Sequence, residues 1–429
     1  MGVERRRTTQ WLVAAIVATL GSTRLCHGEP GGVQPATYAA TAEPDDAVAG
    51  RVRLVRQLIA TRRNDPALVA QLLQLTADLP PQEGAAAFEE LATVRAAAGE
   101  FNEAAEVRRS IVERYPDLPA ALAATRWLAA LYGSSEVAFA AQPASAAHEV
   151  ADEGGHSVGV AFARYALSAM DQAVQRHPEW ADDPQLLTAR AAAGRRIGAA
   201  DAALSWLRPL KRLPPGDPWG DAARMEGWLL DPGADEPPKA LVPCPAAEPP
   251  VLDGVLADAC WRAATIVQLG AAPTTDEVRL AHDAEYLYVA IRAAALAPAD
   301  AQSPADAPPR THDSADRTGD HVRLLLDVDR DYATWFELVV DPRGHTAEGA
   351  WTDASWNPEW FVAASRDGQR WQAEAAIPWS SLTVAAPAAG EAWAIAVQRV
   401  HGPGGVEPST AEGRPGLQDP AAFTVLRFE

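Results

Sequence analysis

The feature that most constrains the fold of this chain is a change of periodicity between residues 231 and 250. From about residue 50 to residue 230, apolar side chains recur with helical spacing, and Pro or Gly interrupts them at helix-length intervals. Beyond residue 250 the apolar side chains form short alternating runs, which are typical of strands with one buried face. No helix-length pattern separates these runs, which excludes a parallel α/β sheet. The chain therefore predicts an α + β protein with helical repeats followed by an antiparallel, jelly-roll-like β-sandwich.

Four segments follow from this change and from local composition. Residues 1–30 combine a basic start, an apolar run from Trp11 to Leu20 and small residues, and we expect them to be a signal peptide. Residues 45–230 are the helical region, residues 231–250 are a Pro-rich linker, and residues 251–429 are the β-sandwich. The apolar run is shorter than the roughly 20 residues that span a bilayer, so no membrane span is expected. The protein is expected to be periplasmic or secreted.

The net charge limits the classes of molecule that this protein is expected to bind, and the cysteine content bears on whether it contains a disulfide. The formal net charge of −20 at pH 7 opposes binding to phosphate backbones and to anionic lipid surfaces, so nucleic acid is not expected as a partner. Cys244 and Cys260 remain after the signal peptide, and an even pair in an exported chain suggests one disulfide. Two free buried thiols are the alternative.

Part of the helical region resembles tetratricopeptide repeats. In the best-matching unit, small and aromatic residues fall at the offsets of the roughly 34-residue repeat: Phe88, Leu91, Ala92, Gly99, Phe101, Ala104 and Pro116. A second copy runs from Pro184 to Asp217, with Gly198 in the turn, and a partial third copy ends near Pro178. The resemblance implies that the helices dock a partner protein.

The C-terminal region resembles the family 9 carbohydrate-binding modules. The landmarks occur in the family's order and cover nearly the whole region: Val251-Leu252-Asp253-Gly254, Trp261, Tyr286 to Val289, Asp320 before Val322, Trp371 with Glu374 and Ile377-Pro378, Trp393 to Arg399, and Asp419-Pro420 with Phe423. The resemblance implies a β-sandwich that binds a polysaccharide or its end.

The family's sugar site is not preserved residue by residue. Its members hold a sugar between two tryptophans, whose places are taken here by residues near Arg317 and Leu417, and Arg323 replaces an acid. Trp335 and Glu337 stand where the family has Gln and Arg. Aromatic rings stack on sugar C–H faces while charged groups bond to hydroxyls. The candidate sugar-binding residues are Trp335, Glu337, Trp351, Trp356, Arg317 and Arg323.

For several other residues, a structural role competes with a role in ligand binding. Trp261, Trp360, Trp371 and Trp393 are expected to pack inward, and Arg399 with Glu374 is expected to form an ion pair. Asp327, Asp329 and Asp331 alternate in a predicted hairpin and are candidate ligands for structural calcium, which prefers oxygen donors. A solvated turn is the alternative.

A serine-hydrolase motif is also present. Gly155-His156-Ser157-Val158-Gly159 has the spacing of a nucleophile elbow, which requires a buried strand before it. The preceding residues are polar, so we interpret Ser157 as a helix N-cap.

The leading hypothesis is a non-catalytic, exported carbohydrate-binding protein whose helices dock a partner. An envelope structural or assembly protein that has lost sugar binding is the alternative, and a serine hydrolase acting through Ser157 is a lesser one.

Overall fold

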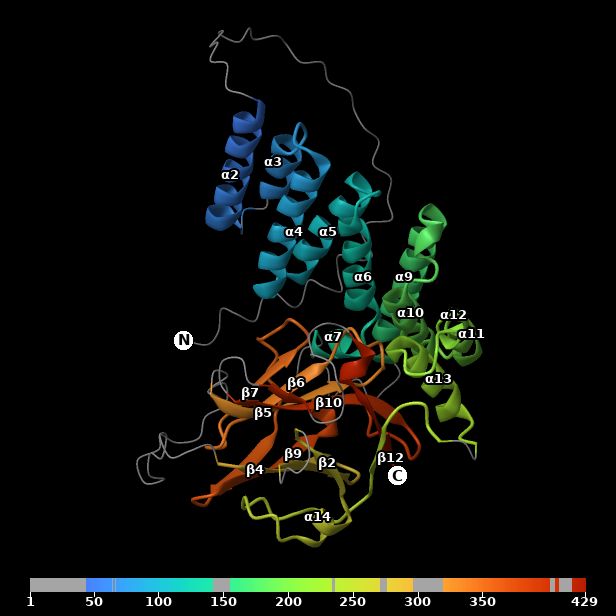
Figure 1. Ribbon diagram of the computed structural model, residues 1–429, viewed down its shortest axis with the longest axis vertical. Coiled ribbons are helices and arrows are strands. Elements are labelled where there is room, and N and C mark those ends of the chain that lie inside the picture. Colours follow the sequence, from blue (N-terminus) through green and yellow to red (C-terminus); the bar gives the residue numbers. More distant parts are fainter. Residues whose placement is uncertain are drawn as a thin grey trace. The chain divides into compact units, whose positions relative to one another are not determined.

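The computed structural model describes residues 44–63, 65, 67–141, 155–233, 236–270, 276–295, 319–401, 406–408 and 419–429 (Figure 1). The predicted signal peptide, residues 1–30, lies outside these ranges. Among the described helices, none combines the length and the apolar character that crossing a bilayer requires.

The region before residue 231 is helical, as its periodicity predicted. Its helices are α2 (Pro44–Arg62), α3 (Leu68–Leu75), α4 (Pro81–Ala97), α5 (Phe101–Arg114), α6 (Pro119–Gly133), α7 (Ser135–Ala140), α9 (Gly155–Arg176), α10 (Pro184–Arg196), α11 (Ala200–Trp206), α12 (Arg208–Lys211) and α13 (Pro218–Leu230).

Two helix hairpins lie where the repeat pattern placed them. Gly99 joins α4 to α5 and Gly198 joins α10 to α11, and each glycine has a φ of 78°, a left-handed conformation that costs little without a Cβ. Pro184 occupies the first turn of α10, and the Asp183 carboxylate caps that helix by accepting from the Leu186 N–H. The helical nature of the region is confirmed, whereas its membership of the tetratricopeptide class stays a prediction.

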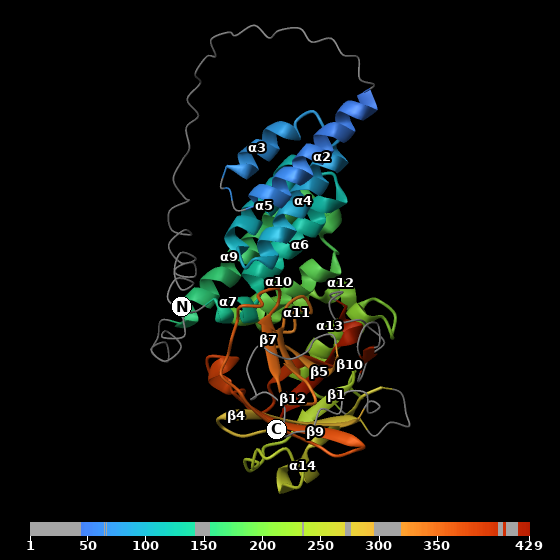
Figure 2. The same cartoon turned by 90° about the vertical axis from the view of Figure 1, so that its left-hand side faces the viewer.

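The C-terminal region is a sandwich of two β-sheets (Figure 2). One sheet orders its strands β1 (Leu241–Cys244), β12 (Thr424–Phe428), β10 (Ala392–His401), β5 (Asp320–Asp327), β6 (Phe336–Val340) and β7 (Thr346–Ala350), with β11 (Val406–Pro408) paired to β10. The other orders β2 (Thr265–Gln268), β3 (Glu277–His282), β4 (Tyr286–Ala294), β9 (Arg370–Pro378) and β8 (Phe361–Arg366). We call these the seven-stranded and the five-stranded sheet, counting strands of the described residues.

The predicted sandwich is confirmed, with two differences in detail. The described strand pairs are antiparallel except for β1 and β12, which are parallel. The segment 231–250 was predicted to be a linker only, but it contains β1, because alternate β1 side chains including Cys244 reach the core between the sheets. Alternate residues of the other strands fill the same core, which is lined by Val, Leu, Ile and Trp side chains.

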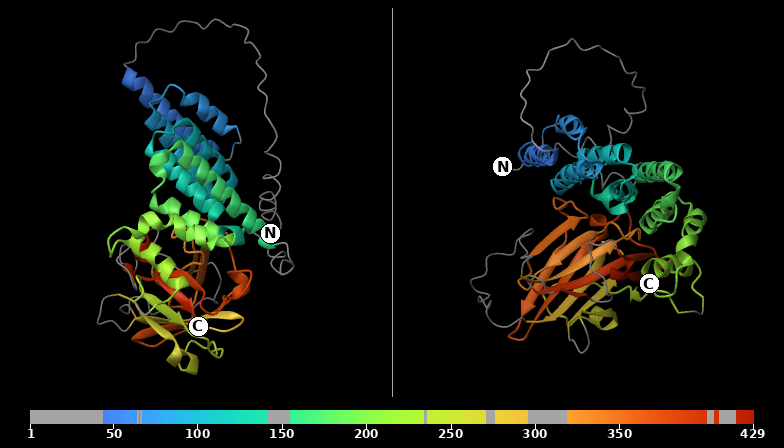
Figure 3. Two further views of the ribbon diagram at one scale, coloured as in Figure 1. Left: turned by 90° about the vertical axis from the view of Figure 1, so that its right-hand side faces the viewer. Right: turned by 45° about the horizontal axis from the view of Figure 1, so that its top comes forward.

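The chain divides into two compact units, Met1–Thr125 and Arg126–Glu429, rather than at the predicted boundary of residues 231–250. The physical reason is that helix α13 and the β-sandwich bury apolar side chains against each other within the second unit. Ala222 of α13 packs in one cluster with Leu325 and Ala396 on the outer face of the seven-stranded sheet, and Met225 packs with Val425. Helix α13 and the sandwich therefore share apolar clusters (Figure 3).

The two cysteines do not form the disulfide that their number suggested. Cys244 points into the core between the sheets, whereas Cys260, on the short helix α14 (Ala259–Ala263), packs in a separate cluster with Trp261 and Tyr288. Both thiols are free and buried in the structure, which is the alternative that the sequence left open.

Candidate functional site

The candidate ligand-binding face is the outer surface of the seven-stranded sheet. Val322 and Leu324 of β5 and Leu338 of β6 point into the core, so strand alternation turns Arg323 and Glu337 outward. Leu325 pairs with Glu337 across the two strands, which makes Arg323 a diagonal neighbour of Glu337.

Arg323 and Glu337 form an ion pair on this face. The Arg323 Nε donates to Glu337 Oε1 at 2.6 Å. The Arg323 side chain is 29% exposed and the Glu337 side chain 12%. Gly349 of β7 is the partner of Glu337 across the sheet and has no side chain to cover the carboxylate. The guanidinium of this pair is therefore partly accessible on the outer face of the sheet, whereas the carboxylate is nearly buried.

Trp351 lies at the end of β7, two residues beyond Gly349. Its φ of 55° is left-handed, which for a bulky side chain costs on the order of 1 kcal/mol or more. The Trp351 N–H donates to the Trp335 carbonyl oxygen at 2.7 Å, and the Ala350 N–H donates to the Asp353 carbonyl oxygen at 3.0 Å. These backbone bonds hold the turn and place the half-buried Trp351 indole at the edge of the sheet.

The other predicted aromatic residues are more strongly engaged in packing. Trp335 is 8% exposed and contacts the Phe423 ring with centroids 5.9 Å apart, over the outer face of the sheet. Trp356 stacks on Phe336 at 4.6 Å and 25° and packs against the core between the sheets. Arg317 lies outside the described residues. The structure thus brings Arg323, Glu337 and Gly349 together and places Trp351 directly after the strand that contains Gly349.

The end of β5 and the loop between β5 and β6 hold the three predicted calcium ligands. Asp327 accepts from the backbone N–H groups of Asp331 and Tyr332, and Asp331 accepts from those of Ala333 and Thr334. These bonds close a tight loop, with left-handed Tyr332 at a φ of 57°. The loop ends where β6 begins, at Phe336.

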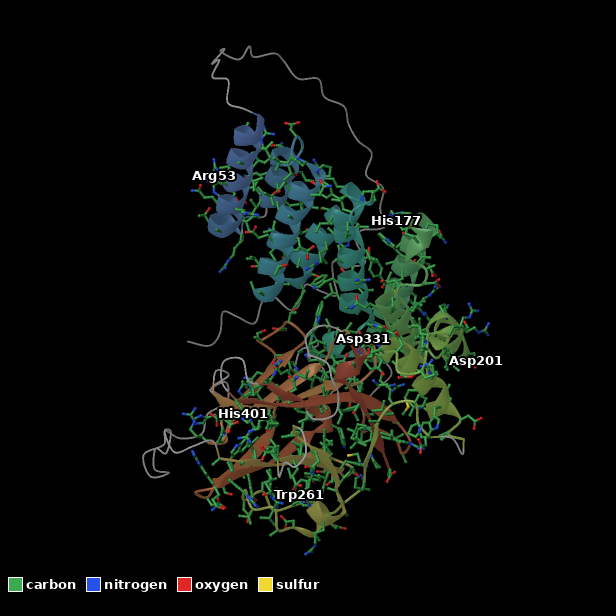
Figure 4. The ribbon with its side chains drawn as sticks, in the orientation of Figure 1. Arg53, His177, Asp201, Trp261, Asp331 and His401 are labelled. Atoms are coloured by element: carbon green, nitrogen blue, oxygen red, sulfur yellow. The ribbon has the colours of Figure 1, made fainter. Side chains whose placement is uncertain are left out.

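A fourth carboxylate joins this loop from helix α7. Glu136 Oε1 accepts from the Val328 N–H, and its Oε2 accepts from the hydroxyls of Ser134 and Thr334. Oxygens of Glu136, Asp327 and Asp329 lie within 4.8 Å of one another, a spacing in which one cation can be shared. Figure 4 labels Asp331 beside α7, but Asp331 is not a member of that group of three.

Burial and mutual repulsion govern the charge state of this acidic cluster. Burial raises the pKa of Glu136 well above its ordinary value, and the nearby charges of Asp329 and Asp331 raise it further. The pKa of Asp327 is raised in the same way, first by burial and then by Asp331, and that of Asp331 is raised to about 7 by burial and Asp329. Arg196 offsets part of the charge at 3.4 Å from Asp329. Hard oxygen donors with excess negative charge fit Ca²⁺, and the fitting set is Glu136, Asp327 and Asp329.

A buried ion triad lies between α10, α13 and the same loop. Glu226 accepts from Arg330 Nε at 2.6 Å and lies 3.1 Å from Arg195 Nη1. Burial alone would raise the pKa of Glu226, but the positive charges of Arg195 and Arg330 outweigh it and lower that pKa to about 2. Sequence reasoning missed Glu136 and Glu226, because each lies far along the chain from the loop that it contacts.

The expected ion pair between Arg399 and Glu374 is not formed. Arg399 instead pairs with Asp276 and, at 2.8 Å, with Asp320. Glu374 accepts from the Trp261 Nε1 at 2.6 Å and from the Gly254 N–H at 2.8 Å. The pairing fails because Glu374 lies between Ala373 and Ala375, which point into the core, so its own side chain points to the outer face of the five-stranded sheet, where Trp261 lies. The four tryptophans expected to pack inward are buried, including Trp261 of α14, which Figure 4 labels.

The hydrolase motif does not form a nucleophile elbow. Gly155 to Gly159 lie in the first turns of α9, so Ser157 belongs to a helix and not to a strand–helix turn. The expected N-cap position of Ser157 is also wrong, because α9 begins at Gly155.

Comparisons with known proteins find solved structures whose fold resembles that of this chain. No family profile and no curated protein matches this sequence. Two solved structures of a family 9 carbohydrate-binding module from Caldicellulosiruptor kristjanssonii, one with cellotriose and one with glucose, resemble the chain at 16% identity and a TM-score of 0.33. The alignments cover 44% of this chain and 93% and 95% of the two modules, respectively. The likeness concerns the fold alone.

Proposed function

We propose that this protein is a non-catalytic carbohydrate-binding protein whose binding face lies around Arg323, Glu337 and Trp351. The observation that carries the proposal is the Arg323–Glu337 ion pair, whose side chains are 29% and 12% exposed, on the outer face of the sheet near the left-handed Trp351. The carboxylate and the guanidinium bond to sugar hydroxyls, and the indole packs against sugar C–H groups.

Export and partner docking belong to the same proposal. The pattern of residues 1–30 supports export, and the helix hairpins at Gly99 and Gly198 support a tetratricopeptide-like docking region for a partner protein. The periplasm or the exterior is where such a protein would meet polysaccharide.

The test is binding of the purified chain to a panel of soluble and insoluble glycans, by calorimetry and by pull-down. We use the chain with its helices because α13 covers part of the sheet. Trp351→Ala and Glu337→Gln are each expected to weaken binding about tenfold or more, the range of a central contact residue. The matched control is Phe361→Ala, which removes a 43% exposed ring from the other sheet and should bind as the unaltered chain does.

A structural or assembly role is the second candidate, and the burial of Trp335 favours it, because a ring 8% exposed offers little surface to a sugar. Absence of binding to every glycan, together with a specific co-purifying envelope protein, would replace the carbohydrate proposal with this one.

We also propose that Glu136, Asp327 and Asp329 hold Ca²⁺, which would join α7 to the sandwich loop. The test is thermal unfolding with millimolar CaCl₂ against EDTA, with Mg²⁺ as a control. Calcium should raise the unfolding temperature of the unaltered chain but not that of Asp329→Asn. If the unaltered chain unfolds at the same temperature in CaCl₂ and in EDTA, the calcium proposal is wrong.

A further inference from the structure

The guanidinium of Arg323 uses only part of its hydrogen-bonding capacity in the ion pair. Its Nε donates to Glu337 Oε1 at 2.6 Å, and its Nη2 lies 2.6 Å from the same oxygen. Glu337 therefore engages the edge of the guanidinium that Nε and Nη2 form. No described residue accepts from the other edge, which Nη1 and Nη2 form. Because the side chain is 29% exposed, this second edge can meet a ligand.

A second polar group without a partner lies next to Arg323. Gln398 of β10 pairs with Arg323 across the two strands, so the two side chains lie on the same face with their Cβ atoms roughly 5 Å apart. That face is the outer one, because Val397 points into the core. Gln398 is 3% exposed, and no described residue bonds to its amide, which still reaches the surface. Buried polar groups are nearly always hydrogen-bonded, so this amide needs a partner that the described residues do not supply.

The chemistry of these two groups favours a carboxylate that has hydroxyl groups beside it. The two parallel N–H groups of a guanidinium edge match the two oxygens of a carboxylate, and such bonds are roughly twice as strong as those between neutral groups. The nearly buried Glu337 holds the guanidinium in place and offers little acceptor surface of its own. The Gln398 amide can both donate to and accept from a sugar hydroxyl.

The net charge of the chain limits how many carboxylates the ligand carries. At −20, the protein repels a densely charged polyanion, whereas one carboxylate on an otherwise neutral chain meets mainly the local charge of Arg323. We propose that Arg323 and Gln398 recognise a uronic-acid residue, so that the ligand is a polysaccharide with scattered uronic acids on a neutral chain. This inference rests on the proposed carbohydrate function and specifies the ligand class.

The experiment uses three oligosaccharides that carry one residue of glucuronic, galacturonic or mannuronic acid on a neutral chain, together with the methyl ester of each. Calorimetry measures their affinity for the complete chain. The ester lacks the charge of the carboxylate and keeps the rest of the sugar. At least one free acid should bind about tenfold or more tightly than its ester, because bonds between charged groups are the stronger ones.

Variants at the two residues test their roles. Arg323→Gln should abolish the preference for the free acid. Arg323→Lys should retain part of it, because the charge remains but the bidentate edge is lost. Gln398→Leu should weaken the binding of acid and ester alike, since the amide bonds to hydroxyl groups that both share.

Controls separate folding from recognition. Arg262→Gln, which removes an exposed guanidinium from α14 on the side of the five-stranded sheet, should change neither affinity. Unfolding temperatures of all variants identify any that are misfolded. If every free acid binds no more tightly than its ester, or if Arg323→Gln keeps the preference, the inference is wrong, and binding of neutral glycans would leave the proposed function intact. Failure of every glycan to bind, neutral or acidic, would overturn both.

Discussion

Replacing Glu226 by glutamine should destabilise the Arg126–Glu429 unit strongly at neutral pH. The Glu226 carboxylate is paired with Arg195 and Arg330, and its side chain is 7% exposed. Its pKa falls from the ordinary 4.5 to about 2, a difference of about 2.5 pH units. At about 1.4 kcal/mol per unit, this corresponds to about 3 kcal/mol of stability, consistent with the roughly 3–5 kcal/mol lost when one partner of a buried pair is removed.

The sign of the pH dependence follows from the lowered pKa. A carboxyl group whose pKa is lower in the folded state stabilises above its unfolded pKa, and this contribution disappears as pH falls from about 4.5 towards 2. The difference in unfolding free energy between the unaltered chain and Glu226→Gln should therefore be about 3 kcal/mol at pH 7 and shrink below pH 4.5.

The assay is urea unfolding followed by tryptophan fluorescence at several pH values from 7 to 3. Asp78→Asn is the control, because the Asp78 side chain is 80% exposed in its ion pair with Arg51 and should contribute less than about 0.5 kcal/mol. A loss below about 1 kcal/mol for Glu226→Gln at pH 7, or a loss that does not depend on pH, would refute the account of the triad.

Three further predictions concern burial. Glu136→Gln should stabilise the calcium-free protein at pH 8, since the raised pKa of Glu136 makes stability fall as pH rises. Urea unfolding in EDTA at pH 8 and pH 5 checks this, and the gain should be smaller at pH 5. Gly254→Ala should cost about 2 kcal/mol or more by thermal unfolding, because φ is 81° and the new Cβ would lie 2.7 Å from the backbone of Ala364. Cys244 and Cys260 should not react with a thiol reagent until the protein unfolds, since burial raises the pKa of both thiols, that of Cys260 to about 11, and reductant should leave the unfolding temperature unchanged.

The sequence determined the elements whose signal is local. Helical spacing before residue 231 and alternation after residue 250 predicted the two classes of structure, and Gly99 and Gly198 marked the turns of two helix hairpins. Edge strand β7 was not predicted, because Thr346–Ala350 is small and polar, which weakens the alternating signal.

Tertiary structure decided what depends on contacts between distant residues. The orientation of Arg323 and Glu337 could be derived from strand alternation, but the contact of Trp351 with Trp127 depends on where α6 packs. Likewise, Glu136 completes an acidic cluster with Asp327 and Asp329 only because α7 meets the β5–β6 loop. Periodicity specifies which face of an element is apolar, and it does not specify which other element that face will meet.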